Sequence, residues 1–234
     1  MANVRQSIGS TLGFQRRARR RGGRHGARPG ARAAAGDETL VTATRGEAAV
    51  PVCPKSIVLV GLMGAGKSCI GRKLARELNL PFVDADEEVE KAAGCSIEDI
   101  FELYGEKAFR DGEERVIARL LDSGLQVLAT GGGAFMNSRT RERIKATGIS
   151  IWLRAELDVL VRRTRRRADR PLLKNDDPRA TLERLMKERY PVYAEADIIV
   201  DSKDEEVDIT VTRILKDLKS WLGRVTAAAP SENP

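Results

Sequence analysis

The chain has 234 residues, of which 41% are hydrophobic and 32% charged, and its formal net charge is +7. That length suits one well-buried domain with a tail and is too short for two ordinary domains. Nine arginines and no acidic residue lie within residues 1–36, which leaves 32 basic and 34 acidic residues for the rest. The charge excess belongs to the tail, so we expect no nucleic-acid partner for the folded part. No apolar run approaches the roughly 20 residues of a membrane helix, so we expect no membrane partner.

Residues 1–55 form an extension rich in Arg, Gly, Ala and Pro without a sustained apolar period. Such a segment buries too little surface to offset its ordering entropy, and we expect it to be disordered. A solvated tail, an Arg-rich organelle transit peptide and an RNA- or anion-binding segment are the alternatives. We therefore expect a cytoplasmic protein, with organelle targeting through the extension as the alternative.

Short apolar runs alternate with helical periods over residues 56–224. The runs that predict strands are 57–60, 81–84, 127–130, 149–153 and 198–201. The periods that predict helices are 67–78, 86–93, 96–104, 106–122, 139–147, 156–167, 178–194 and 204–222. This alternation predicts an α/β domain with a parallel sheet covered on both faces, followed by a frayed tail over 225–234.

A phosphate-binding motif follows the first strand directly and opens a helix. The segment Gly61-Leu-Met-Gly-Ala-Gly-Lys-Ser68 satisfies G-x-x-x-x-G-K-[ST] completely. Its glycines allow a tight turn whose N–H groups point inward at a phosphate, and the helix N-terminus adds a positive end. Lys67 supplies a cation for the β and γ phosphates, and the Ser68 hydroxyl can bind Mg²⁺. The motif predicts nucleotide binding and leaves the acceptor open.

Two carboxylates, Asp84 and Asp86, end the second strand at the sheet edge where ligands of open α/β sheets bind. Strand alternation would place both on the same side of an extended segment. One could hold Mg²⁺ through water while the other orients an attacking hydroxyl or accepts its proton. The alternative is a helix N-cap, for which Asp is also favoured.

Three consecutive glycines, Gly131 to Gly133, end the third strand and precede a helical segment. Such a strip permits close backbone approach to a ligand and supplies N–H donors, although it is a weak signal alone.

Taken together, these motifs resemble those of the shikimate kinases. The resemblance covers about residues 56–202. It rests on Gly61–Ser68, Asp84-Ala-Asp86, Ile100-Phe101, Gly105-Glu106, Phe109-Arg110, Glu113, Thr130–Gly133, Arg170-Pro-Leu-Leu173, Arg189, Tyr193 and Ala196-Asp197. It implies a three-layer P-loop kinase fold of the nucleoside monophosphate kinase type, with a five-stranded parallel sheet. It also implies a helical substrate-binding segment at about 84–113 and a mobile lid at about 164–177.

For the donor side, the resemblance implies that Lys67 contacts the phosphates and that Ser68 binds Mg²⁺ with Asp84 near the metal. Arg163 takes the place of the adenine-stacking arginine, and Arg170 in the lid closes over the phosphates. The implied ATP-binding positions are Gly64, Ala65, Gly66, Lys67, Ser68, Cys69, Arg163 and Arg170. Cys69 stands where the family usually has Thr, outside the minimal motif, so we expect activity to be retained.

For the acceptor side, the resemblance implies that Asp86 binds the acceptor hydroxyls and is the catalytic base or orienter. The planar guanidinium groups of Arg110 and Arg189 would bind the substrate carboxylate. The implied lining also includes Gly131, Gly132, Gly133, Phe101 and Phe109, with Lys67, Asp86 and Arg170 as the catalytic set.

The implied reaction is ATP-dependent phosphorylation of the 3-hydroxyl of shikimate by a monomeric enzyme, with Mg²⁺ as cofactor and ATP as co-substrate. Two other readings are weighed against it. A catalytically silent binding protein would be expected to have lost Lys67, Asp86 or the carboxylate-binding arginines, and all of these residues are present. A kinase acting on gluconate or a nucleoside monophosphate would share the phosphate loop but has little reason to carry the acceptor residues together.

Overall fold

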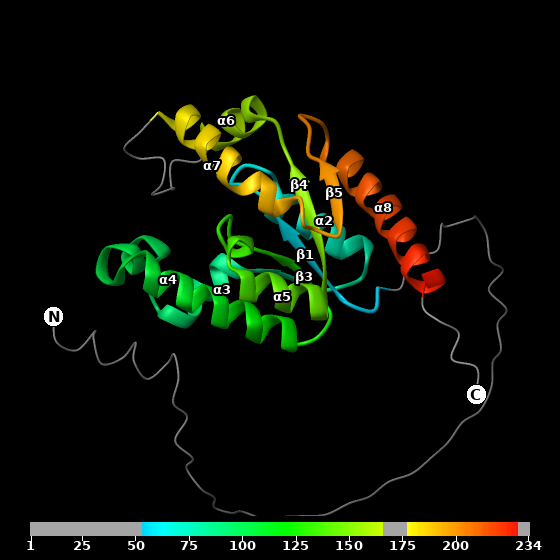
Figure 1. Cartoon of the computed structure of the whole chain (residues 1–234), viewed down its shortest axis with the longest axis horizontal. Coiled ribbons are helices and arrows are strands. Elements are labelled where there is room, and N and C mark those ends of the chain that lie inside the picture. Colours follow the sequence, from blue (N-terminus) through cyan, green and yellow to red (C-terminus); the bar gives the residue numbers. More distant parts are fainter. Residues whose placement is uncertain (1–52, 166–176, 229–234) are drawn as a thin grey trace, which may run out of the picture. The chain divides into compact units, whose positions relative to one another are not determined.

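The computed structural model describes residues 53–165 and 177–228 (Figure 1). A five-stranded sheet with the order β2-β3-β1-β4-β5 lies at its centre, and every neighbouring pair of strands is parallel. The strands are β1 (Ser56–Val60), β2 (Phe82–Asp84), β3 (Val127–Ala129), β4 (Gly148–Arg154) and β5 (Ile198–Asp201). The predicted fold class is therefore confirmed.

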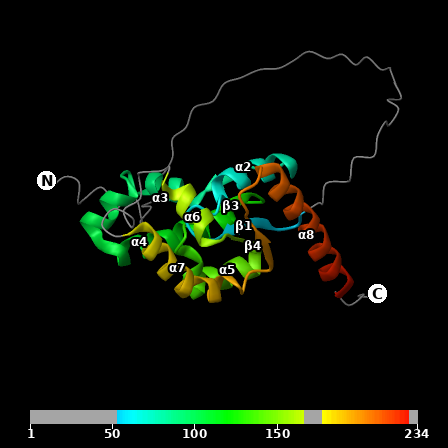
Figure 2. The ribbon, with the colours of Figure 1, turned by 90° about the horizontal axis from the view of Figure 1, so that it is seen from above.

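Helices cover both faces of the sheet. They are α2 (Lys67–Glu77), α3 (Ala85–Ala93), α4 (Ile97–Asp122), the short 3₁₀ helix η1 (Ala134–Met136), α5 (Ser138–Thr147), α6 (Leu157–Arg165), α7 (Pro178–Tyr193) and α8 (Val207–Ala228). Helices α2 and α8 pack together on one face, while α4, α5, α7 and η1 pack on the other (Figure 2). The sheet and the helices on its two faces are the three layers of the predicted fold.

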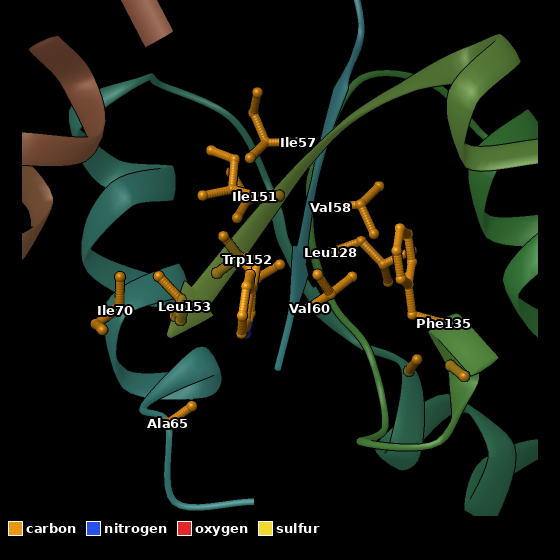
Figure 3. Packing of buried hydrophobic residues seen from close by; sticks show 14 of the residues in the cluster. Ile57, Val58, Val60, Ala65, Ile70, Leu128, Phe135, Ile151, Trp152 and Leu153 are labelled. Carbon is orange, nitrogen blue, oxygen red and sulfur yellow. The ribbon is translucent and has the colours of Figure 1, made fainter. Parts of the chain in front are cut away.

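The central strand β1 shows why the sheet is buried on both sides. All five of its residues are buried, as expected for a central strand of a parallel sheet. Alternation sends its side chains to opposite faces, so that Ile57 lies on the side of Ile70 in α2, and Val58 on the side of Phe135 in η1 (Figure 3). Strand β1 therefore packs against both helical layers, and the loop that follows it starts between them.

Helix α2 approaches the sheet closely at Gly71. A Cβ atom at this residue would lie 2.6 Å from the Phe82 ring and 3.0 Å from Leu59 Cδ1. Only glycine allows this approach, which packs the middle of α2 against the first residue of β2.

The break predicted between the helices at 96–104 and 106–122 is confirmed, since α4 is interrupted at Gly105, where φ is 80° and the backbone is not helical. Two other predicted boundaries differ from the structure. Helix α8 continues to Ala228, because Leu215, Leu218 and Trp221 extend its apolar face, so residues 225–228 of the expected frayed tail are helical. The folded part begins by Cys53 rather than 56, since the Cys53 side chain is buried in the core.

The predicted disorder of residues 1–52 falls outside the described residues, as does most of the predicted lid. Within 53–165 and 177–228, no helix combines the length and apolarity needed to cross a membrane.

Candidate active site

The phosphate loop runs from the end of β1 to the start of α2. Gly61, Gly64 and Gly66 have φ values of 139°, 82° and 95°, in the region that favours glycine. A Cβ atom at Gly61 would also lie 2.8 Å from the Leu153 carbonyl oxygen. The glycines are thus needed both for the backbone conformation and for the close contact with β4.

Lys67 lies against this loop. Its Nζ donates to the carbonyl oxygens of Gly61 at 2.7 Å and Leu62 at 3.0 Å. The ammonium group is held at the N-terminus of α2, where the backbone N–H groups and the helix dipole favour an anion.

Ser68 connects the phosphate loop to the end of β2. Its Oγ donates to Asp84 Oδ2 at 2.7 Å, and the other carboxylate oxygen of Asp84 accepts the Asp86 backbone N–H at 3.1 Å. Asp84 is therefore the N-cap of α3, and Asp86 lies in the first helical turn. The expectation that both carboxylates lie along an extended segment is wrong, because the helix begins directly after Asp84. The Asp84 side chain is thus both the helix N-cap given as the alternative and a neighbour of the Ser68 hydroxyl.

Thr130 ties the glycine strip to the base of the phosphate loop. Its backbone N–H and its Oγ1 both donate to the Leu59 carbonyl oxygen, at 3.2 Å and 3.0 Å. The strip that follows, Gly131–Gly133, therefore starts directly beside Gly61.

The glycine strip runs between the acceptor-side carboxylates and arginines. A Cβ atom at Gly131 would lie 2.5 Å from Glu113 Oε1 and 2.7 Å from Asp86 Oδ1. A Cβ atom at Gly133 would overlap the Arg110 guanidinium, and one at Gly132 would lie 3.4 Å from Arg189 Nη1. The structure therefore brings together Asp86, Arg110, Arg189 and the three glycines, which the sequence analysis had assigned to one pocket.

Glu113 is an additional charged group in this cluster. It is buried, and its Oε2 accepts from Arg110 Nη1 at 2.8 Å. Its Oε1 is buried without a hydrogen-bond partner among the described residues. Burial raises the pKa of the Glu113 carboxyl and the Asp86 carboxylate raises it further, whereas Arg110 opposes the shift. The sequence analysis quoted Glu113 without giving it a role, although its position three residues after Arg110 on one helix was a usable signal.

Arg189 and Tyr193, on α7, complete the acceptor side. The Tyr193 hydroxyl donates to the Gly132 carbonyl oxygen, and Arg189 hydrogen-bonds the Tyr193 phenol. Burial raises the pKa of Tyr193 to about 12, and the positive charge of Arg189 opposes the shift. Helix α7 is thereby joined to the glycine strip.

One cleft of about 460 Å³ contains much of this arrangement. Its lining includes Gly64, Gly66, Lys67, Ser68, Cys69, Asp84, Asp86, Gly132 and Arg163. Six of the eight predicted donor residues and Asp86 of the acceptor side thus face a common space, while Ala65 is not part of the lining and Arg170 lies outside the described residues.

Comparison with known proteins gives a consistent assignment. A family model described as shikimate kinase matches residues 63–219. A shikimate kinase of Paramagnetospirillum magneticum is 61% identical over 72% of this chain and 86% of its own length. The chain belongs to the shikimate kinase family. A shikimate kinase of Rhodopseudomonas palustris is 52% identical over 83% of this chain and 97% of its own length.

Solved structures lead to the same family. A shikimate kinase from Acinetobacter baumannii in complex with shikimate superposes with a TM-score of 0.69 at 38% identity, covering 71% of this chain and 93% of that one. The predicted family is confirmed, and the chain is a kinase of the P-loop fold.

Other predicted site residues of this kinase lie as follows. The Phe101 and Phe109 rings pack at a tilt of 36° with centroids 4.8 Å apart, and Arg110 Cζ lies 4.9 Å from the centre of the Phe109 ring. Arg163 lines the cleft beside the phosphate loop, where its Nη1 donates to the Gly64 carbonyl oxygen and to the Ser202 hydroxyl. Arg170 lies outside the described residues, as do residues 166–176 of the lid predicted at about 164–177.

Proposed function

We propose that the chain transfers the γ-phosphoryl group of ATP to the 3-hydroxyl of shikimate, giving shikimate 3-phosphate and ADP. The observation that carries this proposal is the glycine strip Gly131–Gly133, which runs against two carboxylates and two arginines directly beside the phosphate loop. A hydroxylated carboxylic acid needs both kinds of partner, since carboxylates accept from its hydroxyls and arginines bind its carboxylate.

On the acceptor side, Arg110 and Arg189 hold the shikimate carboxylate with their planar guanidinium groups. Glu113 keeps the Arg110 guanidinium in place through the 2.8 Å ion pair, and Phe101 and Phe109 form the apolar wall next to it. Binding at the arginines turns the ring so that its hydroxyls face Asp86.

In the chemical step, the 3-hydroxyl oxygen forms a bond to the γ-phosphorus while the bond from that phosphorus to the bridging oxygen of ADP breaks. Asp86 orients the hydroxyl and accepts its proton. Lys67 stabilises the charge that develops on the phosphoryl oxygens, and Arg170 supplies a second cation.

The residues beside the phosphate loop fit Mg²⁺. The Ser68 hydroxyl and the Asp84 carboxylate lie 2.7 Å apart and are oxygen ligands of the kind this ion prefers. Kinase sites commonly hold this ion with one or two protein ligands together with substrate phosphates and water, and these two residues fit that pattern. We assign Ser68 and Asp84 to this ion, which when bound neutralises phosphate charge.

The remaining assignments extend the proposal. Gly64 to Cys69 bind the phosphates, and Arg163 contacts the adenine end. We propose a monomer that has no nucleic-acid or membrane partner. The relatives come from bacteria, which supports a cytoplasmic enzyme over an organelle-targeted one.

An assay of ADP release across a panel of acceptors tests the proposal. The panel contains shikimate, quinate, gluconate and nucleoside monophosphates. Proton-coupled ³¹P NMR of the product identifies the phosphorylated hydroxyl. We expect ADP release with shikimate and a phosphate on its 3-hydroxyl. ADP release with gluconate or a nucleotide but not with shikimate would refute the acceptor assignment and leave the kinase assignment intact.

A further inference from the structure

Ser202 is a buried hydroxyl that sits behind the phosphate loop. It follows β5 directly, its exposed fraction is 2%, and its backbone N–H donates to the Arg154 carbonyl oxygen at 2.7 Å. It belongs to neither the acceptor side nor the catalytic set and has no part in the reaction described above. Its position is fixed by the end of β4, which also adjoins the phosphate loop.

The Ser202 hydroxyl joins two parts of the nucleotide site. Its Oγ donates to the Ala65 carbonyl oxygen within the phosphate loop at 2.9 Å. The same oxygen accepts from Arg163 Nη1, also at 2.9 Å. A serine hydroxyl has one proton to donate and lone pairs to accept with, so both bonds can form at once.

Arg163 is held at the cleft by further acceptors around it. Its Nη1 reaches the Gly64 carbonyl oxygen at 3.4 Å, and its Nη2 donates to the Lys203 carbonyl oxygen. The Ser202 bond is the shorter of these two Nη1 bonds, and through the Ser202 hydroxyl it links the guanidinium to the phosphate loop at Ala65. Without it, Arg163 keeps a long contact to Gly64 and a contact to a surface loop.

We infer that Ser202 is a positioning residue for nucleotide binding, which acts by holding the Arg163 guanidinium against the phosphate loop at Ala65. This inference rests on the nucleotide-binding part of the proposed function and is independent of the acceptor. Ser202 has no contact with substrate in this role, and its effect reaches the nucleotide through Arg163 and the loop backbone.

The test is calorimetric titration of ADP, in buffer with magnesium chloride and without an acceptor, into the wild-type chain and its variants. Ser202→Ala should weaken ADP binding roughly tenfold, the loss expected for a hydrogen bond to a charged group. Arg163→Ala should weaken it at least as much. In the double variant, loss of Ser202 should add little, because its partner is already gone.

Ser56→Ala is the matched control. Ser56 is as buried as Ser202, and its Oγ likewise donates to a carbonyl oxygen, of Gly124, and accepts an N–H, from Gln126. It lies at the opposite end of β1 from the phosphate loop. The Ser56→Ala variant should lower thermal stability about as much as Ser202→Ala does and leave the ADP dissociation constant unchanged.

Several outcomes would overturn the inference. Wild-type ADP affinity in Ser202→Ala would do so, as would equal weakening in Ser56→Ala or full additivity in the double variant. Should Ser202→Ala fail to fold, Ser202→Cys keeps the volume while weakening the hydrogen bond, and wild-type affinity there would count equally against it. A wild-type chain that binds ADP but leaves shikimate unphosphorylated would refute the proposed acceptor alone.

Discussion

The Ser68 hydroxyl and the Asp84 carboxylate lie 2.7 Å apart, and this contact joins the start of α2 to the end of β2. Asp84 also caps α3, so one carboxylate has a structural role and faces the phosphate site. The two roles can be separated by experiment.

Asp84→Ala should lower the free energy of unfolding by about 0.5–2 kcal/mol through loss of the cap, and should also raise the Mg²⁺ concentration needed for half-maximal activity. Urea denaturation and a magnesium titration of the initial rate measure the two effects. Ser96→Ala is the control, because Ser96 caps α4 away from the cleft. It should reduce stability similarly and leave the magnesium dependence as in the wild type. An unchanged magnesium dependence in Asp84→Ala would contradict the metal assignment.

Lys67→Ala should reduce kcat by about 10²–10³-fold, because a cation at the developing phosphoryl charge is lost. Steady-state kinetics measure this effect, and thermal unfolding checks that the fold is retained. Lys67 is partly buried and donates to the backbone carbonyl oxygens of Gly61 and Leu62, so the unfolding measurement separates the loss of these bonds from the loss of catalysis. Turnover near that of the wild type would remove Lys67 from the catalytic set.

Arg110→Ala should raise the KM for shikimate by a factor equivalent to about 2–5 kcal/mol, since it also leaves the Glu113 carboxylate buried without its partner. Arg189→Lys should raise it less, because lysine keeps the charge and loses the two-pronged geometry. The ADP dissociation constant without shikimate should change little in either variant.

The control for the arginines is Arg72→Ala. Arg72 also lies over a phenylalanine ring, with Cζ 5.0 Å from the Phe82 centroid, and pairs with a carboxylate, Glu87, at 3.2 Å. It stands on the exposed side of α2 and should leave the KM for shikimate unchanged. An equal rise in the KM for shikimate in Arg72→Ala and Arg110→Ala would indicate a general effect on folding and not the loss of a carboxylate-binding site.

Gly131→Ala should abolish shikimate phosphorylation while ADP still binds, because the added Cβ would lie within 2.7 Å of both Glu113 and Asp86 oxygens. Titration with ADP and the acceptor assay measure the two properties separately. Gly112→Ala is the matched change, since a Cβ at this α4 residue meets nothing within 4 Å. It should retain activity and gain about 0.5–1 kcal/mol of stability from the better helix former. Normal shikimate kinetics in Gly131→Ala would place the acceptor elsewhere.

Tyr193 makes stability depend on alkaline pH. Burial raises its pKa from 10.0 to about 12, so above pH 10 the unfolded chain releases the proton more readily than the folded one. The stabilisation from this shift is complete below pH 10 and is lost as the pH rises through about 12. Tyr193→Phe should be less stable at pH 8, having lost the bond to Gly132, and should lose less stability between pH 10 and 12. Urea denaturation at several pH values measures this difference, with exposed Tyr104→Phe as control. A steep alkaline loss in Tyr193→Phe equal to that of the wild type would contradict the assignment.

Much of the site could be predicted because its residues belong to short local motifs. The loop from Gly61 to Ser68 requires glycines and a helix start that are adjacent in sequence, and the break at Gly105 was expected from the same local chemistry. Contacts between residues that are far apart in the sequence could not be predicted. Ser202 is 137 residues from Ala65, and only the sheet order brings β5 and β1 onto the two sides of β4. For Glu113, the spacing from Arg110 could have indicated the ion pair, but its burial depends on the distant glycine strip and could not be predicted.

The paired hydrogen bonds from Thr130 to the Leu59 carbonyl make the two halves of the site one rigid unit at their base. The strands that carry the phosphate loop and the glycine strip cannot slide past each other without breaking both. Any adjustment of the gap between nucleotide and acceptor must then come from the helices above the sheet. A descendant of this kinase could therefore acquire a different acceptor through changes on α4 and α7, while its phosphate-binding half remained as it is.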